Sequence, residues 1–312
     1  MKLRLLLNVA LLMFLNISIF AQQSPNLTHF MFNKNVFNPS TIADGDELCV
    51  SAFYRSQWTG IDGAPVLMGV NAAMPKLTKN MGVGLAVYND KLGKYNRIQI
   101  EGNYAYSIYL KDAIFSMGLK VGVLNMSLSD LNFVTPETEA GNDPDIFYGK
   151  TSSWAPNFGI GFQYMAKKWY VGFSILNLLE QNNSFDEVII SQKRQYYFTS
   201  GYTIRLNSAF KIIPNIMLRT DMSAYQFDLN VNAEIYENLI VGSTYRWQDS
   251  ASILLGYSLL EDLKLYYSYD FGVNKIGSFS QSGGSHELSV KYCFSFAEKV
   301  KKSKKNRNVR FL

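Results

Sequence analysis

The sequence predicts an all-β protein: an antiparallel transmembrane β-barrel of about 14 strands in an outer membrane, with both termini in the periplasm. The main observation is a two-residue rhythm, clearest over 97–110 and 225–235, in which apolar residues alternate with polar or small ones. Successive side chains of a strand point to opposite faces, so each such strand has one apolar face. That face would form the core of a soluble sandwich, but in a closed membrane barrel it contacts lipid while the polar face lines the lumen.

The second observation is an export signal. Lys2 and Arg4 precede a short apolar stretch that ends at Ala21, and this is the pattern of a secretory signal peptide over residues 1–21, with cleavage near Ala21. The alternative is an N-terminal membrane anchor, but the stretch is short for a spanning helix. No later segment approaches about 18 continuous apolar residues, so no transmembrane helix is expected. The composition, 47% hydrophobic with 20 Tyr and 21 Phe, suits strands with aromatic girdles at both membrane interfaces.

Fourteen stretches fit a strand template, and each is followed by a turn signal. They are 47–58, 65–74, 81–89, 96–110, 113–126, 156–165, 169–176, 195–206, 210–219, 223–235, 239–247, 251–259, 264–272 and 286–296. Tight connections such as 111–112 and 166–168 follow even-numbered strands, whereas the connections near 127–155, 177–194 and 273–285 are long. Outer-membrane barrels have short periplasmic turns and longer external loops, which places both termini in the periplasm.

The chain after the signal peptide is expected to divide into three segments. Residues 22–45 are expected to form a periplasmic or plug segment, 46–296 the barrel, and 297–312 a basic periplasmic tail. The net charge of +5 falls to +3 without the two cations of the signal peptide, and to −4 without the seven cations of the tail. Those seven are Lys299, Lys301, Lys302, Lys304, Lys305, Arg307 and Arg310. The tail suits an acidic protein or anionic headgroups, and no nucleic-acid partner is expected because aromatic residues are not interleaved with the basic ones.

Two features concern the inside of the barrel. Small residues alternate with apolar ones over 113–126 and 156–165, which leaves room for something in the lumen. Fourteen strands close only if the first pairs with the last, antiparallel, and this puts Cys49 and Cys293 at similar heights across the closing seam. Two interpretations stay open: a disulfide across the seam, or two unrelated small apolar residues.

The sequence gives little support for an enzyme. It holds two histidines, His29 before the barrel and His286 in the last strand, and no Gly-x-Ser-x-Gly, Cys-x-x-Cys or His-Glu-x-x-His motif. The densest acidic group lies in a long loop and lacks the spacing of a calcium loop. Its members are Glu137, Glu139, Asp143 and Asp145. No catalytic, cofactor-binding or metal-ligating residue is therefore expected.

Three short blocks carry a family resemblance. They are His29-Phe30-Met31-Phe32-Asn33 with Phe37-Asn38-Pro39-Ser40, then Tyr54-Arg55-Ser56-Gln57-Trp58-Thr59-Gly60-Ile61-Asp62-Gly63-Ala64-Pro65, then Tyr88-Asn89-Asp90-Lys91-Leu92-Gly93. In this order the blocks resemble the PorP/SprF family of type IX secretion proteins, although the usual Asn-Pro-Ala is Asn-Pro-Ser here. The family-motif or partner-contact candidates are Met31, Phe32, Asn38, Pro39, Arg55, Gln57, Trp58, Gly63, Ala64, Pro65, Asn89, Asp90 and Gly93.

The resemblance implies an outer-membrane barrel of a Bacteroidota-type diderm. It also implies partnership with type IX secretion or gliding components on the periplasmic side, and with C-terminal signal domains of exported proteins. Two interpretations of the second block stay open. In one it is structural, with Trp58 in the interface girdle, Arg55 paired inside the lumen and Gly63 in a turn; in the other it contacts cargo.

A function of a different class also fits the sequence. Some fourteen-strand transporters of hydrophobic compounds carry an N-terminal hatch with Asn-Pro, as Asn38-Pro39 does here. The alternative to a secretion role is therefore a passive outer-membrane channel for a hydrophobic or small solute.

Overall fold

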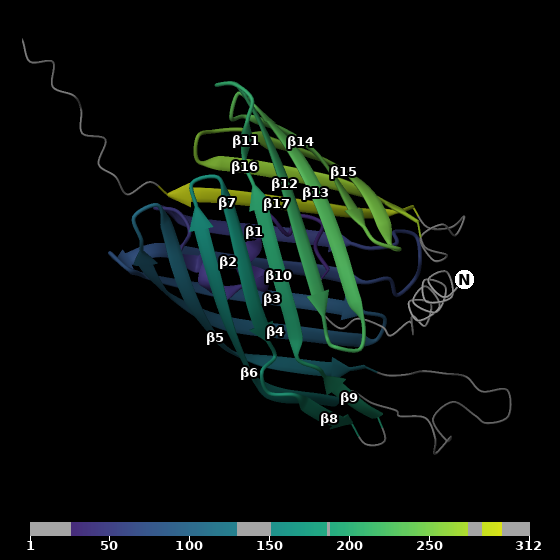
Figure 1. Cartoon of the computed structure of the whole chain (residues 1–312). Coiled ribbons are helices and arrows are strands. Elements are labelled where there is room, and N and C mark those ends of the chain that lie inside the picture. The colour runs from purple at the N-terminus through teal and green to yellow at the C-terminus, as the bar shows by residue number, and fades with distance from the viewer. Residues whose placement is uncertain (1–25, 130–150, 186–187, 274–282, 295–312) are drawn as a thin grey trace, which may run out of the picture.

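The computed structural model describes residues 26–129, 151–185, 188–273 and 283–294, which form one closed antiparallel barrel (Figure 1). The strands are β1 (Leu48–Ser56), β2 (Val66–Thr78), β3 (Met81–Leu92), β4 (Tyr95–Tyr109), β5 (Ala113–Leu128), β6 (Thr151–Ala166), β7 (Trp169–Leu176), β8 (Gln181–Phe185), β9 (Val188–Gln192), β10 (Gln195–Tyr202), β11 (Ile204–Arg205), β12 (Phe210–Thr220), β13 (Tyr225–Ile235), β14 (Leu239–Arg246), β15 (Ser250–Ser258), β16 (Leu263–Gly272) and β17 (Ser285–Phe294). The predicted signal peptide 1–21, the acidic loop group at 137–145 and the tail 297–312 lie outside the described residues.

The predicted closure is confirmed. Strand β1 pairs antiparallel with β17, and Cys49 lies directly opposite Cys293 in that register. The two cysteines form a disulfide, with their Cα atoms 4.0 Å apart. Cys49 and Cys293 are each two residues from inward-facing Ser51 and Lys291 and so share their face, which puts the disulfide on the lumenal side of the seam, near the end with the tight turns.

Fourteen strands form the barrel, as the alternation predicts, because β10 and β11 together make one barrel strand that is interrupted at Thr203. Three details differ from the sequence prediction. Strand β6 begins five residues earlier than expected, at Thr151, and β2 continues past Pro75 through an irregularity in its pairing with β3. The connection 177–194 is not a plain loop, since it contains the separate two-stranded hairpin β8–β9.

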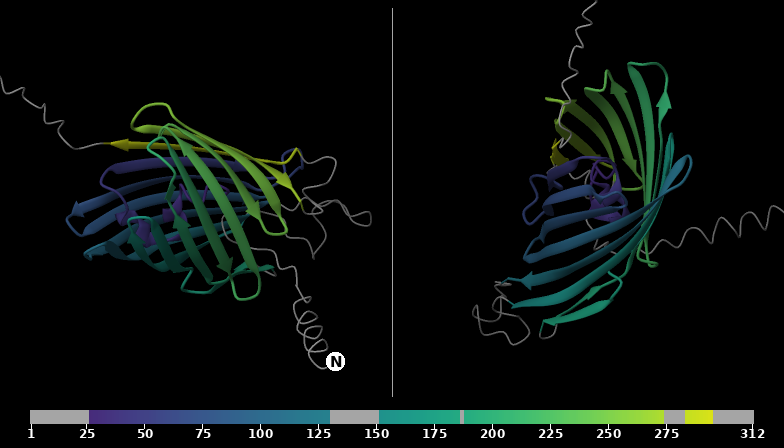
Figure 2. Two further views of the ribbon diagram at one scale, coloured as in Figure 1. Left: turned by 45° about the horizontal axis from the view of Figure 1, so that its top comes forward. Right: turned by 90° about the vertical axis from the view of Figure 1, so that its left-hand side faces the viewer.

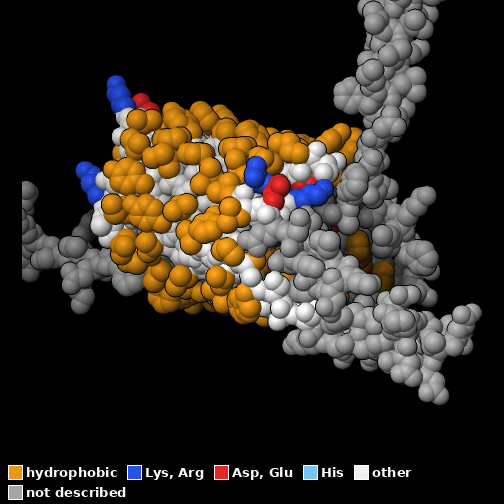
Figure 3. All heavy atoms as spheres, turned by 90° about the horizontal axis from the view of Figure 1, so that it is seen from below, with side chains coloured by type: hydrophobic (Ala, Val, Ile, Leu, Met, Phe, Trp, Pro, Cys, Tyr) orange, Lys and Arg blue, Asp and Glu red, His pale blue; other side chains and the backbone are white. Residues whose placement is uncertain are grey.

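The two faces of the wall differ as the alternation predicts. Ile100, Leu119, Val231 and Leu255 are exposed on the outside, and apolar side chains cover the wall seen in Figure 3. The inner face is polar and buried. One example is a hydrogen-bonded row in which Asn215 Nδ2 donates to Asn230 at 3.1 Å. Among the described residues, no helix is long and apolar enough to cross a membrane.

Residues 26–44, which we call the plug, lie inside the barrel, as the purple segment in the right-hand view of Figure 2 shows. The plug contains helix α2 (Lys34–Phe37) and the 3₁₀ helix η1 (Pro39–Ala43). The buried apolar core lies between plug and wall, with Leu27 and Phe30 packed among lumenal residues. A short apolar segment thus fills the space that the small inward residues leave.

The plug runs along the lumen from one end of the barrel to the other. Asn26 lies at the end with the long loops, because Arg219 at the end of β12 donates to its Oδ1 at 3.1 Å. The plug then leads to the start of β1 at Leu48, at the end with the tight turns, where Phe294 also lies. The prediction that both termini lie in the periplasm concerns residues outside the described ranges and stays a prediction.

Candidate functional site

The start of the plug is fixed to the wall by a buried group of charges, which we call the ionic latch: Arg55, Asp270 and Glu287 of the wall with Thr28 and His29 of the plug. The guanidinium of Arg55 lies 2.7 Å from Asp270 Oδ2 and 3.0 Å from Glu287 Oε2. The backbone N–H groups of Thr28 and His29 donate to the Glu287 carboxylate at 2.6 and 2.9 Å. The Thr28 hydroxyl donates to Asp270 at 2.8 Å. Each carboxylate therefore binds plug and wall at once.

His29 is fully buried beside this group. Its Nδ1 lies 2.8 Å from Ser289 Oγ and 3.3 Å from Glu287 Oε1, while its Nε2 has no hydrogen-bond partner. Burial lowers the pKa of His29 below its ordinary value of 6.5, and this outweighs the opposing effect of Glu287. His29 is therefore neutral in the seated plug at neutral pH.

A second buried ion pair holds the middle of the plug. Lys120 of β5 lies 2.7 Å from Glu101 of β4, and its ammonium also donates to the carbonyl of Val36 at 3.0 Å. On the neighbouring side, the hydroxyl of Ser174 donates to the carbonyl of Phe37 at 2.5 Å. These wall side chains bind the last carbonyls of α2, which have no partner within so short a helix.

The turn at Asn38-Pro39 rests on two inward glycines, Gly118 of β5 and Gly161 of β6, which we call the glycine seat. A Cβ at Gly118 would lie 2.2 Å from Ser40 N, and one at Gly161 would lie 2.0 Å from Asn38 Oδ1. Asn38 begins η1, since its Oδ1 accepts from Ser40 N at 3.0 Å and a proline occupies the first helical position. Only glycine leaves space for this turn to contact the wall.

The structure brings parts of the first two family blocks together in the lumen. Met31, Phe32, Asn38 and Pro39 lie in the lumen with Arg55. Phe32 stacks on Tyr266 of β16 with ring centroids 3.9 Å apart. The first block thus forms the plug, and the Arg55 of the second block is paired inside the lumen, as the structural interpretation of that block expects.

The rest of the second and third blocks lies at the end with the long loops. The N–H of Gly93 donates to Gly63 O at 2.9 Å, so the β1–β2 loop touches the β3–β4 turn. Within that loop, Gln57 N donates to Pro65 O at 2.9 Å. Trp58 is half-buried there, and its backbone N–H donates to Ser285 Oγ at 3.1 Å. Asp90 lies 3.1 Å from Arg97. The remaining candidates at this end are Ala64 and Asn89. No observation assigns these residues to cargo.

Sequence reasoning did not single out Asp270, Glu287, Glu101 or Lys120. Each is a charged residue at an inward position of a predicted strand. A charged residue at an inward position is the signal in the sequence that could have identified them, because a charge on the lumenal face of a membrane strand indicates a partner inside the barrel.

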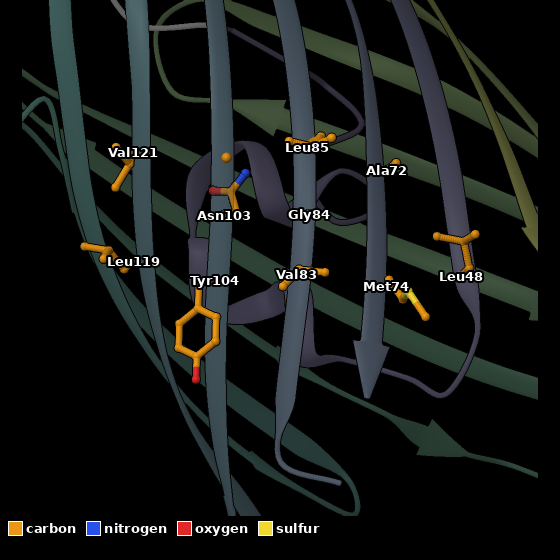
Figure 4. Close-up of a pocket in the computed structure, with 11 residues that line it drawn as sticks. Leu48, Ala72, Met74, Val83, Gly84, Leu85, Asn103, Tyr104, Leu119 and Val121 are labelled. Atoms are coloured by element: carbon orange, nitrogen blue, oxygen red, sulfur yellow. The ribbon is translucent and has the colours of Figure 1, made fainter. Parts of the chain in front are cut away.

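Two hollows adjoin the wall. One, of about 580 Å³, lies on the outer face of β1–β5, where the small Ala72 and Gly102 are surrounded by Val83, Tyr104 and Leu119. Figure 4 shows these strands in front of the plug, with Tyr104 and Leu119 directed away from it. The other, of about 340 Å³, lies in the lumen between plug and wall, near the tight turns.

Comparison with known protein families identifies the family of this chain. The sequence profile of the family described as "Type IX secretion system membrane protein PorP/SprF" matches residues 19–292. The chain belongs to this family. It is therefore an outer-membrane component of type IX secretion. A search of curated proteins gave no match.

Solved structures of two outer-membrane barrels share the fold of this PorP/SprF protein. The Ralstonia pickettii toluene transporter TbuX is 9% identical with a TM-score of 0.51, and the match covers 83% of this chain and 92% of TbuX. The CymD monoaromatic hydrocarbon channel is 12% identical with a TM-score of 0.51, and the match covers 90% of this chain and 95% of CymD. At these identities the likeness concerns the fold alone.

Proposed function

We propose that this PorP/SprF barrel is a non-enzymatic accessory that engages C-terminal signal domains of exported proteins, for secretion or surface anchoring. Its periplasmic side would contact type IX secretion or gliding components. The observation that carries the proposal is the family match over residues 19–292. The filled lumen supports it, because a barrel whose interior is occupied has its two ends and its outer wall left to bind partners.

The ionic latch bears on where cargo would bind. Asp270 and Glu287 are fully buried and already bind Thr28, His29 and Arg55. While the plug is seated, these lumenal charges are not available to cargo. Contacts with a signal domain would therefore fall to the loops and barrel ends, unless the plug leaves.

The second candidate is a passive channel for a hydrophobic or small solute. The fold likeness to the toluene transporter TbuX and the channel CymD favours it. Such a channel requires a path past the plug, and the latch and glycine seat oppose one in this state.

Gene deletion separates the two functions. We expect deletion to remove one or more proteins from the secreted and surface fractions, with restoration by the wild-type gene and unchanged uptake of toluene. An unchanged secreted profile together with lost uptake would establish the channel and reject the secretion role.

The basic tail gives a narrower test of the periplasmic contacts. Removal of residues 299–312 is expected to leave the barrel assembled but to weaken co-purification of periplasmic secretion components, and the difference from wild type should shrink at high salt, which screens the charges of the tail. A full-length control with the seven Lys and Arg residues of the tail changed to Gln separates charge from length. Unchanged co-purification in both variants would count against docking through the tail.

A further inference from the structure

Three lysines gather in the lumen near the tight turns: Lys34 of the plug, Lys264 of β16 and Lys291 of β17. Lys264 and Lys291 are direct cross-strand partners on the inner face, and both Lys34 and Lys264 lie close enough to Lys291 to repel its charge. Among the described residues, none of the three forms an ion pair within 4.0 Å. Asp44 and Glu47 lie close enough to Lys291 to offset part of this repulsion, but like charges placed directly opposite still destabilise a sheet.

Other lumenal lysines have carboxylate partners. Lys120 lies 2.7 Å from Glu101, and Lys211 lies 2.9 Å from Glu234. Each of these two lysines thus has a counter-ion on the wall. Among the described residues Lys34 has no carboxylate within 4.0 Å, and Asp44, which accepts from Gln163 at 2.7 Å, offsets only part of the cost of burying the Lys34 charge.

Lys34 instead lies over an aromatic ring. Its ammonium is 3.7 Å from the ring centroid of Tyr170, a cation–π arrangement. Burial lowers the pKa of Lys34 from its ordinary value, because its charge is poorly solvated there. An anion bound beside the ammonium would offset that cost.

The lumenal cavity of about 340 Å³ contains both of these groups. Its apolar lining includes Met31, Phe32 and Ile240. Its polar lining includes the amides of Asn215 and Asn232, and the carboxylate of Glu234, which is paired with Lys211 at 2.9 Å. Lys167 and Lys168 of the β6–β7 turn also line it, which places its mouth at the end with the tight turns. The volume and the mixture of apolar walls with a few polar groups are those of a small-molecule site.

We propose that this cavity binds a small organic acid, with the carboxylate against Lys34 and the apolar body against Met31, Phe32 and Ile240. Lys264 and Lys291 do not line the cavity, but their charges on another part of the inner wall would raise the local concentration of anions. This site goes beyond the proposed secretion function and does not depend on it.

The test uses the full mature protein in lipid nanodiscs and 2-naphthoate as the probe, with binding measured by equilibrium dialysis against empty nanodiscs. We expect 2-naphthoate to bind at least about tenfold more tightly than the neutral 2-naphthamide, because a charge-assisted contact is lost in the amide. Lys34→Met should weaken 2-naphthoate binding by a similar factor and leave 2-naphthamide unchanged. Lys111→Met, at an exposed tight turn of the same end, is the matched control and should bind as wild type.

A second variant keeps the proposal testable if Lys34→Met disturbs the plug. Ile240→Trp fills the cavity from the wall and should abolish binding while the heat-modifiable gel mobility of the barrel is retained. Equal binding of acid and amide, or 2-naphthoate binding that survives both variants, would overturn the site.

Discussion

The two halves of the plug are held by different forces. Residues 26–33 are fixed by the ionic latch, in which the wall supplies an arginine and two carboxylates. Residues 38–44 fit mainly by shape, with the turn after α2 against Gly118 and Gly161. Between the two halves, Lys120 and Ser174 bind the carbonyls of Val36 and Phe37. The first attachment depends on paired charges. The second depends on glycine at positions 118 and 161, because a methyl group at either position would clash with the plug.

This difference predicts two modes of failure. A buried ion pair fails when one partner is removed, because the remaining charge is left without compensation. A close-packed contact fails when an atom is added. The attachments also lie on different parts of the wall, β1, β16 and β17 against β5 and β6. We therefore expect that one half of the plug can be released while the other remains seated.

Arg55→Met is expected to have the largest effect. It leaves the carboxylate of Glu287 buried without an arginine partner and that of Asp270 with only Arg246 at 4.0 Å, and removing one partner of a buried pair costs about 3–5 kcal/mol. The predicted result is release of the plug's first half. It would be measured as a lower urea midpoint and faster protease cleavage of the plug in detergent-solubilised barrel.

The control for Arg55→Met is Lys167→Met, which removes an exposed pair with Asp112. Exposed pairs contribute little, so the urea midpoint and the cleavage rate should not change. If Arg55→Met also left both unchanged, the ionic latch would not hold the plug.

The seam disulfide is the next largest expected effect, because it joins the two strands that carry Arg55 and Glu287. Replacing Cys49 and Cys293 by Ser should cost about 2–4 kcal/mol, the usual range for a disulfide. The loss should appear as a lower temperature for the heat-induced shift in gel mobility. Reductant should lower this temperature in the wild type and have no effect on the double variant. If reductant left the wild type unchanged, β1–β17 hydrogen bonding alone would be enough to hold the seam.

Adding one methyl group to the glycine seat tests the shape-held half. Gly118→Ala places a Cβ against the backbone of Ser40 and should cost about 1–3 kcal/mol, as overpacking does. The matched control is Gly102→Ala, where the nearest atom to the new Cβ is Val121 O at 3.7 Å, an ordinary contact. We expect protease cleavage near residues 38–44 to rise in the first variant alone. Equal cleavage in both would mean that the seat tolerates the methyl group.

Much of the barrel was predictable because its physics is local. Alternation determines which face of a strand meets lipid, and this gave the fourteen strands and the pairing of the first with the last. The same alternation placed small residues such as Gly118 and Gly161 inside, where the plug now lies. The disulfide was left open because parity and strand count give approximate height but not register.

The partners of the site were not predictable for a related reason. Parity places Arg55, Asp270 and Glu287 in the lumen, but their meeting depends on the register of two strand pairs and on where the plug runs. The hairpin β8–β9 was missed because 177–194 lies between barrel strands and was interpreted as a plain connection. In both cases the information lies in contacts between distant parts of the chain.

The smallest expected effect is a pH dependence of the charge-held half. The groups that face His29 are Glu287, Asp270, Arg55 and the hydroxyl of Ser289. Because burial lowers the pKa of His29 in the seated plug, the released plug binds a proton more readily. The stability of the seated state is therefore fully present above pH 6.5, the ordinary pKa of His, and falls as the pH drops below it.

We expect protease cleavage of the plug to rise between pH 7.5 and 5.5, and His29→Gln to remove that slope. The other histidine provides the control. His286 lies on the outer face, where its Nδ1 is 2.8 Å from the Tyr267 hydroxyl, so His286→Gln should keep the wild-type slope. A slope that persists in His29→Gln would assign the pH dependence to the carboxylates of the latch, and would mean that the buried imidazole does not set it.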